Sequence, residues 1–379
     1  MVVFEKPHEL FAHNLLFLRW LADFCGVDMM VENYRFNVRT FLCLGAQVIV
    51  IISVVYSAVF YYPDWLYVLK LVIPLSFCVQ GAIKFYNAYV YRHFFALMYG
   101  RLERFHYKHR DDAENNASLL LLMERIHLIS KALAILFLSA GIGFVLYAVY
   151  MYCNFHERVL MLALRFPWID ADSILGYTIT TGIQSLVLIV SVTGFAAADS
   201  AILLFVASLA GFADVFTNDL KKLNKELNFR SPDMRFIRSK VRNLCSQHQD
   251  IIEYESDSDE RYIATCFVQV ATAVCCMSAS LFLVYIERYP PGFAILVASF
   301  FELLEFCLLG TILTIKNEEI SEAIYATDWF LLDKSEQSCF QLMLHKSQIV
   351  TEMTVGGTTK HRNIRWDYES NIFIFYNDD

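Results

Sequence analysis

Polar and ionisable residues stand inside apolar stretches of this chain, and they are the first candidates for chemistry. Gln80, Lys84 and Asn87 are spaced i, i+4 and i+7, so on a helix they would share one face. Glu302 and Glu305 would share a face within another apolar run. A charge inside a membrane is costly and by default marks a function, such as a water-filled or ion-conducting cavity.

These charges also have a simpler interpretation. Lys84 lies near one end of its run and Lys70 near an end of the same run, so we expect both stems to snorkel towards the membrane surfaces. Glu302 and Glu305 lie mid-run, where snorkelling is harder. For these two glutamates we expect a buried polar network or a cavity.

Motifs for catalysis and for metal binding are missing from the sequence. It contains no Walker loop, G-x-G-x-x-G, H-E-x-x-H or G-x-S-x-G, and no Cys/His cluster has metal-ligand spacing. Glu260-Arg261-Tyr262 matches the triplet of G-protein-coupled receptors, but it precedes an apolar run instead of following one, and we interpret it as coincidence. We therefore predict no enzyme activity, no cofactor and no metal site.

Aromatic residues make up 15% of the chain, and many are expected near one membrane surface. A deeper set would lie in the outer halves of the apolar runs. Such residues could simply pack between helices, or they could line an apolar pocket for a small, weakly polar ligand. The candidate ligand-binding residues are Ile73, Phe77, Phe144, Tyr147, Tyr150, Tyr177, Phe282 and Tyr285.

The composition identifies the elements that must hold these residues. The 379 residues are 57% hydrophobic and 18% charged, against about 45–50% and about 25% in soluble domains. The net charge of −8 argues against a nucleic-acid partner. The sequence predicts an all-α polytopic protein in a lipid bilayer, because only helices satisfy their own backbone there.

Six runs are long enough to span a membrane, which takes roughly 20 apolar residues. They are 40–62, 66–90, 129–153, 177–209, 262–286 and 292–315. We expect a six-span bundle over 38–315, in which the long connections 91–128 and 210–261 are helices that continue out of the membrane. A seventh candidate at 340–356 is weak because it contains charged residues.

Lysine and arginine predict the orientation. Segments 1–37, 91–128, 210–261 and 316–339 hold three, six, nine and two of them, whereas the intervening loops hold none, two and one. The segment 1–37 is therefore expected in the cytoplasm, without a cleavable signal peptide. The sequon Asn116-Ala117-Ser118 would face the cytoplasm too, and would not be glycosylated.

The topology and several C-terminal stretches resemble the insect odorant receptor family. Residues 310–313 and 318–325, followed by Trp329, resemble the segment after the sixth span of that family, and 342–348 resemble the start of its seventh. His248 and Gln269 match positions common before and within the fifth span. The chain is thus similar to a tuning subunit with a seven-helix fold.

The resemblance implies a ligand-gated, non-selective cation channel. A tuning subunit would bind a small volatile odorant and assemble with a co-receptor into a heterotetramer in the plasma membrane, in the dendrite of an olfactory sensory neuron. The cytoplasmic ends of the later spans would form an inter-subunit anchor, to which 316–357 and the residues His248, Tyr325 and Trp329 would contribute.

The last residues depart from the family. In its members the second half of the seventh span lines the pore, but here 358–379 form a polar tail. Either the tail comes from an alternative or wrongly assigned exon, or the chain is a truncated, non-conducting receptor. A metabotropic seven-span receptor and a transporter are the other function classes that the sequence leaves open.

Overall fold

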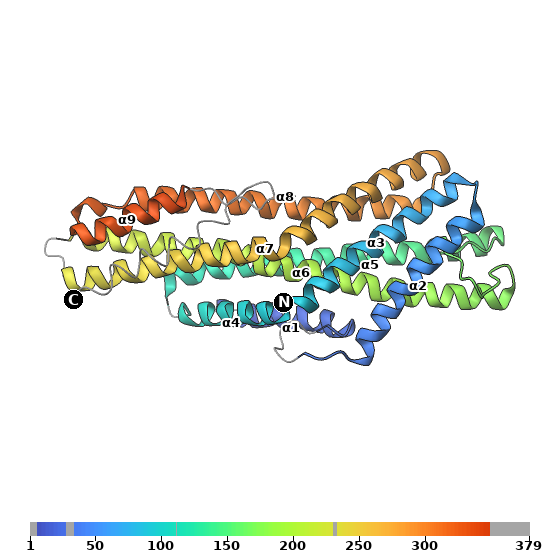
Figure 1. The fold of residues 1–379 in the computed structure, drawn as a ribbon, viewed down its shortest axis with the longest axis horizontal. Coiled ribbons are helices and arrows are strands. Elements are labelled where there is room, and N and C mark those ends of the chain that lie inside the picture. The colour runs from blue at the N-terminus through green and yellow to red at the C-terminus, as the bar shows by residue number, and fades with distance from the viewer. Residues whose placement is uncertain (1–5, 28–33, 111, 230–232, 349–379) are drawn as a thin grey trace.

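The computed structural model describes residues 6–27, 34–110, 112–229 and 233–348, and these residues are helical apart from short connections (Figure 1). The helices are α1 (Pro7–Phe24), α2 (Val38–Tyr61), α3 (Trp65–Val90), α4 (Arg92–Lys108), α5 (Ala113–Phe155), α6 (Ile174–Leu227), α7 (Met234–Glu287), α8 (Pro290–Tyr325), the 3-10 turn η1 (Trp329–Leu331) and α9 (Lys334–Ser347). The described part contains no β-strand, as the sequence predicted.

Six of the described helices are long and apolar enough to cross a membrane. They are α2, α3, α5, α6, α7 and α8, and each coincides with or contains one of the six predicted spans to within one residue. Much of their outer surface is apolar and exposed, as lipid-facing helices require. Hydropathy alone therefore located the spans.

The predicted extensions beyond the spans are present. Helices α6 and α7 have 54 residues each, which at 1.5 Å a residue is about 80 Å, far more than about 30 Å of hydrocarbon. In Figure 1 they run side by side towards α4 and α9. We call this the extension end; the opposite end, with the connections 62–64, 156–173 and 288–289, is the loop end.

Both predicted extension segments are helical but interrupted. In 91–128, α4 ends at Lys108 and α5 begins at Ala113, where Asp112 accepts a hydrogen bond from the Glu114 backbone N–H. In 210–261, α6 ends at Leu227 and α7 starts at Met234. The chain turns back at both breaks; α6 and α7 then pack against each other, whereas α4 packs against α1 and α3.

The segment 1–37 holds a packed helix that we did not predict. Helix α1 buries Leu10, Phe11, Leu15 and Leu18, spaced at helical intervals, and it contacts α4, α5 and α6. The amide of Asn14 donates to the backbone carbonyl of Met123 at 3.0 Å. The N-terminal segment is thus part of the bundle.

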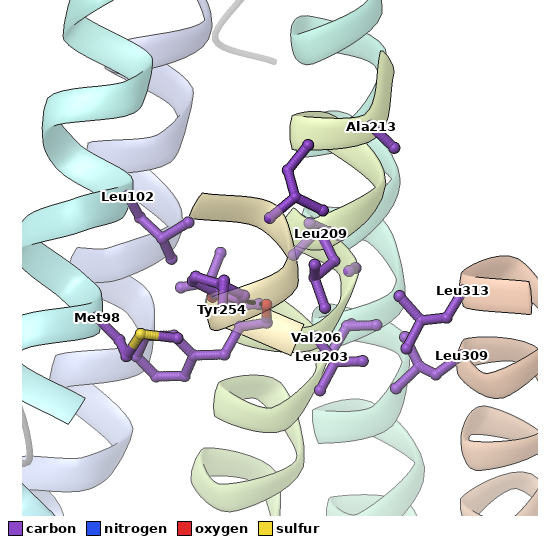
Figure 2. Close-up of a cluster of buried hydrophobic side chains, with 14 of the residues drawn as sticks. Met98, Leu102, Leu203, Val206, Leu209, Ala213, Tyr254, Leu309 and Leu313 are labelled. Carbon is purple, nitrogen blue, oxygen red and sulfur yellow. Dashed lines mark hydrogen bonds between the residues drawn. The ribbon is translucent and has the colours of Figure 1, made fainter. Parts of the chain in front are cut away.

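The largest hydrophobic core lies where α1, α4, α5, α6, α7, α8 and α9 meet. Figure 2 shows its centre, in which Met98 and Leu102 of α4 and Leu309 and Leu313 of α8 surround α6. Tyr254 of α7 is buried here, and its hydroxyl donates to the Phe205 carbonyl at 2.9 Å. This core stiffens the extension end, because closely packed interiors transmit displacement instead of absorbing it.

The C-terminal part is helical over 316–325 and 334–347, and the polar tail lies outside the described residues. Residues 316–325 continue α8, and α9 runs back over α7 and α8. The weak seventh candidate at 340–356 is described only to residue 348, and the polar tail 358–379 lies outside the described residues.

Glycosylation tests the orientation of the bundle. Asn116 lies in the first turn of α5 at the extension end, so we expect the native sequon to stay unmodified when the chain is expressed in insect cells. A sequon introduced at the exposed Glu157 of the loop end should be glycosylated and add a mass that a glycosidase removes. Glycosylation of Asn116 instead would show that the bundle has the opposite orientation in the membrane.

Candidate ligand-binding site

A cavity of about 200 Å³ lies between α2, α3, α5, α6 and α8. Its walls are mainly apolar, and Phe77, Phe137, Phe144 and Phe195 supply the aromatic surface. The C-terminal end of α1 also reaches it through Ala22 and Cys25. An apolar cavity of this size suits a molecule somewhat larger than benzene.

The cavity extends further than the outer halves of the spans. Its lining on α3 runs from Ile73 to Ala88, which is about 22 Å along a helix axis. Small residues make this space: Gly81 and Gly194 line it, and among the described residues a Cβ on Gly194 would meet only the Cys25 sulfur, at 3.4 Å. The cavity is therefore long, narrow and bounded by several helices at once.

Lys84 lines the cavity near the extension end and is buried, so the prediction that it snorkels is wrong. Its Nζ lies 2.5 Å from Asp199 Oδ1 of α6 and 3.4 Å from Glu302 Oε1 of α8. It also lies 4.7 Å from the centre of the Phe195 ring. The lysine stays inside because two carboxylates from other helices offset the cost of burying its charge.

The expected polar network around Glu302 is present. Gln80 and Gln269 both donate to Glu302 Oε1, at 2.6 and 2.7 Å, and Gln269 also reaches Asp199 Oδ1 at 3.3 Å. Four helices, α3, α6, α7 and α8, thus meet at one buried polar cluster beside the cavity. Because α3, α6 and α8 of this cluster also form the cavity walls, a change in how these helices pack at the cavity would alter the contacts within the cluster.

Lys70 and Glu305 are two further charged residues within the apolar runs. Lys70 pairs with Glu287 at 2.5 Å near the loop end, where both side chains are about a quarter exposed, in keeping with snorkelling. Glu305 is buried one helical turn from Glu302, and neither of its carboxyl oxygens has a hydrogen-bond partner among the described residues.

The connection between α5 and α6 folds inwards and closes the cavity at the loop end. Leu162 lines the cavity and Leu164 is fully buried. Gln184 of α6 accepts from the Leu162 N–H at 3.2 Å and donates to the Leu164 carbonyl at 2.8 Å. Arg165 binds Asp172 through two N–H groups, at 3.0 and 2.8 Å. This segment is therefore a fixed cover, built by contacts distant in sequence.

The structure brings three of the eight candidate ligand residues together at the cavity. Ile73, Phe77 and Phe144 line it. The remaining five lie away from its walls, where Tyr147 packs on Tyr289, Tyr177 bonds the Val159 carbonyl, Phe282 packs on Trp65, and Tyr150 and Tyr285 are exposed. Sequence reasoning missed the lining residues Gln47, Cys25, Lys84 and Leu162. A lone amide inside the apolar run 40–62 was the available signal for Gln47.

The three candidate anchor residues lie at the extension end. His248 is enclosed within the chain, where its ring packs on Phe216 at 5.5 Å between ring centres. Trp329 is partly buried and packs against the largest hydrophobic core. Tyr325 is 73% exposed, so it is the one whose side chain is open to another subunit.

A buried histidine at the extension end predicts a pH-dependent stability. His106 of α4 is 2% exposed and its ring stacks on Phe11 of α1, with 4.6 Å between ring centres. Burial, with smaller effects of His109 and His8, lowers the pKa of His106 to about 4. An unfolded histidine has a pKa near 6.5. As the pH falls from about 6.5 to 4, the unfolded state therefore binds the proton before the folded state does, and the free energy of unfolding decreases.

The expected loss from His106 is about 2 kcal/mol at pH 5 relative to pH 7, measured by thermal unfolding of the detergent-solubilised chain. His106→Phe keeps a ring against Phe11 and removes the titrating group, so the unfolding temperature of this variant should fall less between the two pH values. Equal pH dependence of the two proteins would show that His106 does not contribute.

Comparisons with known proteins agree with this geometry. The sequence profile of the family described as 7tm Odorant receptor matches residues 66–361. A Drosophila melanogaster relative described as odorant receptor 83c is 21% identical over 367 residues, which cover 93% of this chain and 92% of the relative.

The fold is also that of a solved receptor. The insect olfactory receptor OR5 from Machilis hrabei superposes with a TM-score of 0.75 at 12% identity, covering 98% of this chain and 97% of that one. Its complex with eugenol gives 0.71 at 13% identity, with coverage of 97% and 96%. The resemblance inferred from the C-terminal stretches is confirmed, and the family and fold fit a receptor or channel rather than an enzyme.

Six spans, the shared fold and the family match together make this a multi-pass membrane protein. The profile covers well over half of the chain, and it includes every helix that lines the cavity apart from α1 and α2. This chain belongs to the 7tm odorant receptor family.

Proposed function

We propose that this chain is an odorant-tuning subunit that binds a small volatile molecule in the cavity between α2, α3, α5, α6 and α8. The observation that carries the proposal is the cavity itself: it is apolar, long and lined by several helices, in a chain of the odorant receptor family. Apolar contacts give such a site modest affinity, and its shape provides selectivity.

Binding would gate a non-selective cation channel formed with a co-receptor in the plasma membrane of an olfactory neuron's dendrite. A ligand shifts a closed–open equilibrium only if it contacts the two states differently. The buried cluster of Lys84, Asp199 and Glu302 supports this coupling, because it joins three helices and Lys84 is also part of the cavity wall. Tyr325 and Trp329 would contribute to the contact with the co-receptor.

Voltage clamp of cells that express the chain with an insect co-receptor tests the proposal. A panel of volatiles should include compounds that evoke an inward current absent from cells with the co-receptor alone. The current should persist when G-protein signalling is blocked; its loss would favour the metabotropic alternative. Silence across a broad panel, with the chain labelled at the cell surface, would contradict the proposal.

The same recording addresses the polar tail. A chain whose tail, 358–379, is replaced by an apolar pore helix of a relative should conduct at least as well as the native chain. If only the chimaera conducts, the native chain is the truncated, non-conducting form, and its role is ligand binding alone.

A further inference from the structure

The cavity contains a polar side chain that the surrounding protein does not use. The amide of Gln47 on α2 forms no hydrogen bond with any described residue, although its backbone carbonyl accepts from the Cys78 thiol at 3.5 Å. Ser191 on α6 also lines the cavity, but a helical serine has the carbonyl four residues earlier as an alternative partner. An amide facing an apolar space without a partner is costly, which makes it a natural site for a ligand oxygen.

Contacts at Gly81 place this amide. A Cβ on Gly81 of α3 would lie 3.3 Å from Gln47 Nε2 and 3.9 Å from Phe195 Cζ. Lys84, one turn further along α3, holds its Nζ 4.7 Å from the centre of the same phenylalanine ring. The Gln47 amide is therefore on the side of the cavity walled by Phe195, and the absence of a side chain at Gly81 leaves room for it.

The charges nearby restrict what the amide can receive. Lys84 lines the cavity, and its ammonium group is already paired with Asp199 and Glu302, which are not among the described lining residues. Glu305 adds a third carboxyl to the same buried region. Among the described lining residues, an anionic ligand could pair only with Lys84, which Asp199 and Glu302 already neutralise, and Glu305 lies in the same region. The cost of removing the anion from water would therefore not be offset. A neutral hydrogen-bond acceptor avoids that cost.

We propose that Gln47 is a specificity-determining residue, and that the cavity takes small neutral molecules, somewhat larger than benzene, that carry one carbonyl or hydroxyl oxygen. The oxygen accepts from the Gln47 amide, and the apolar part lies along Ile73, Phe77 and Phe144. This assignment rests on the proposed function of the cavity as the ligand site.

The test uses two isosteres, acetophenone and alpha-methylstyrene, which differ in having an oxygen or a methylene at the same place. Benzoate is the charged comparison. Each compound is titrated against the detergent-solubilised full chain, and the rise in unfolding temperature gives its apparent affinity. One uncharged hydrogen bond predicts that acetophenone binds about tenfold more tightly than alpha-methylstyrene. Benzoate should not stabilise the chain.

In Gln47→Leu, acetophenone should lose about that tenfold advantage, whereas alpha-methylstyrene should be nearly unaffected. Val50→Leu is the matched control, because Val50 lines the cavity on the same helix without a polar group; it should change both affinities alike. Equal affinities in the native chain, a preference that survives in Gln47→Leu, or tight binding of benzoate would overturn the assignment and leave the cavity as the ligand site. If neither neutral compound stabilises the native chain, the proposed binding site itself fails.

Discussion

Gly194→Leu will weaken the response to activating volatiles about 10- to 100-fold without lowering the amount of receptor at the cell surface. Gly194 lines the cavity from α6, and within the described part of the chain a Cβ there would meet only the Cys25 sulfur within 4 Å. The leucine side chain must therefore enter the cavity and compete with the ligand for space. Overpacking costs about 1–3 kcal/mol, which gives that range of affinity.

The matched control is Gly182→Leu on the same helix, where an added Cβ meets no described residue within 4 Å. Both changes replace a helical glycine with a better helix former, so neither should impair folding. Concentration–response curves from voltage clamp, normalised to surface labelling, compare the two. Equal sensitivity of both variants would mean that the ligand does not occupy this cavity.

Lys84→Met will destabilise the folded chain by about 3–5 kcal/mol, because it removes the charge that Asp199 and Glu302 face inside the bundle. The straight methionine side chain fills similar space, so the loss is mainly electrostatic. We expect the unfolding temperature of the detergent-solubilised chain to drop by several degrees and little of the variant to reach the cell surface.

Two further variants separate charge from packing. Lys84→Met combined with Asp199→Asn removes one carboxylate with the lysine and should recover part of the lost stability. Lys70→Met breaks a pair whose side chains are about a quarter exposed, and should cost at most about 1 kcal/mol. Equal decreases in stability for Lys70→Met and Lys84→Met would show that burial does not make the ion pair of Lys84 more important for stability than the partly exposed one.

The spans and the family could be predicted from the sequence, but contacts between residues far apart in the sequence could not. The apolar runs within α2, α3, α5, α6, α7 and α8 are read from hydropathy alone, because membrane thickness sets their length. Helix α1 was also within reach: Leu10, Phe11, Leu15 and Leu18 recur at helical spacing, but the charges of the segment concealed the pattern.

Lys84 shows why the candidate site was only partly predictable. Its position near the end of an apolar run favoured snorkelling, since the sequence does not reveal that Asp199 and Glu302, 115 and 218 residues away, face it. The rotation of each helix likewise decided which aromatic residues line the cavity. Ile73, Phe77 and Phe144 point inwards, whereas Tyr150 and Tyr285, at similar predicted depths, are exposed.

The cover of the cavity depends on contacts that a local pattern cannot show. Arg165 donates its backbone N–H to Ser57 Oγ at 2.7 Å, across 108 residues, and Gln184 holds Leu162 and Leu164. A connection of this length reads in sequence as an ordinary loop. Its inward fold places Leu162 at the loop end of the cavity and so limits the length of the molecule that the cavity could hold.

A cryo-electron microscopy structure of the receptor complex with an activating compound would show whether the cavity is the ligand site. We expect ligand density between α3, α5 and α6, in contact with Phe77, Phe144 and Phe195. Density for the ligand elsewhere, on the lipid-facing surface or between subunits, with this cavity unfilled, would contradict this expectation.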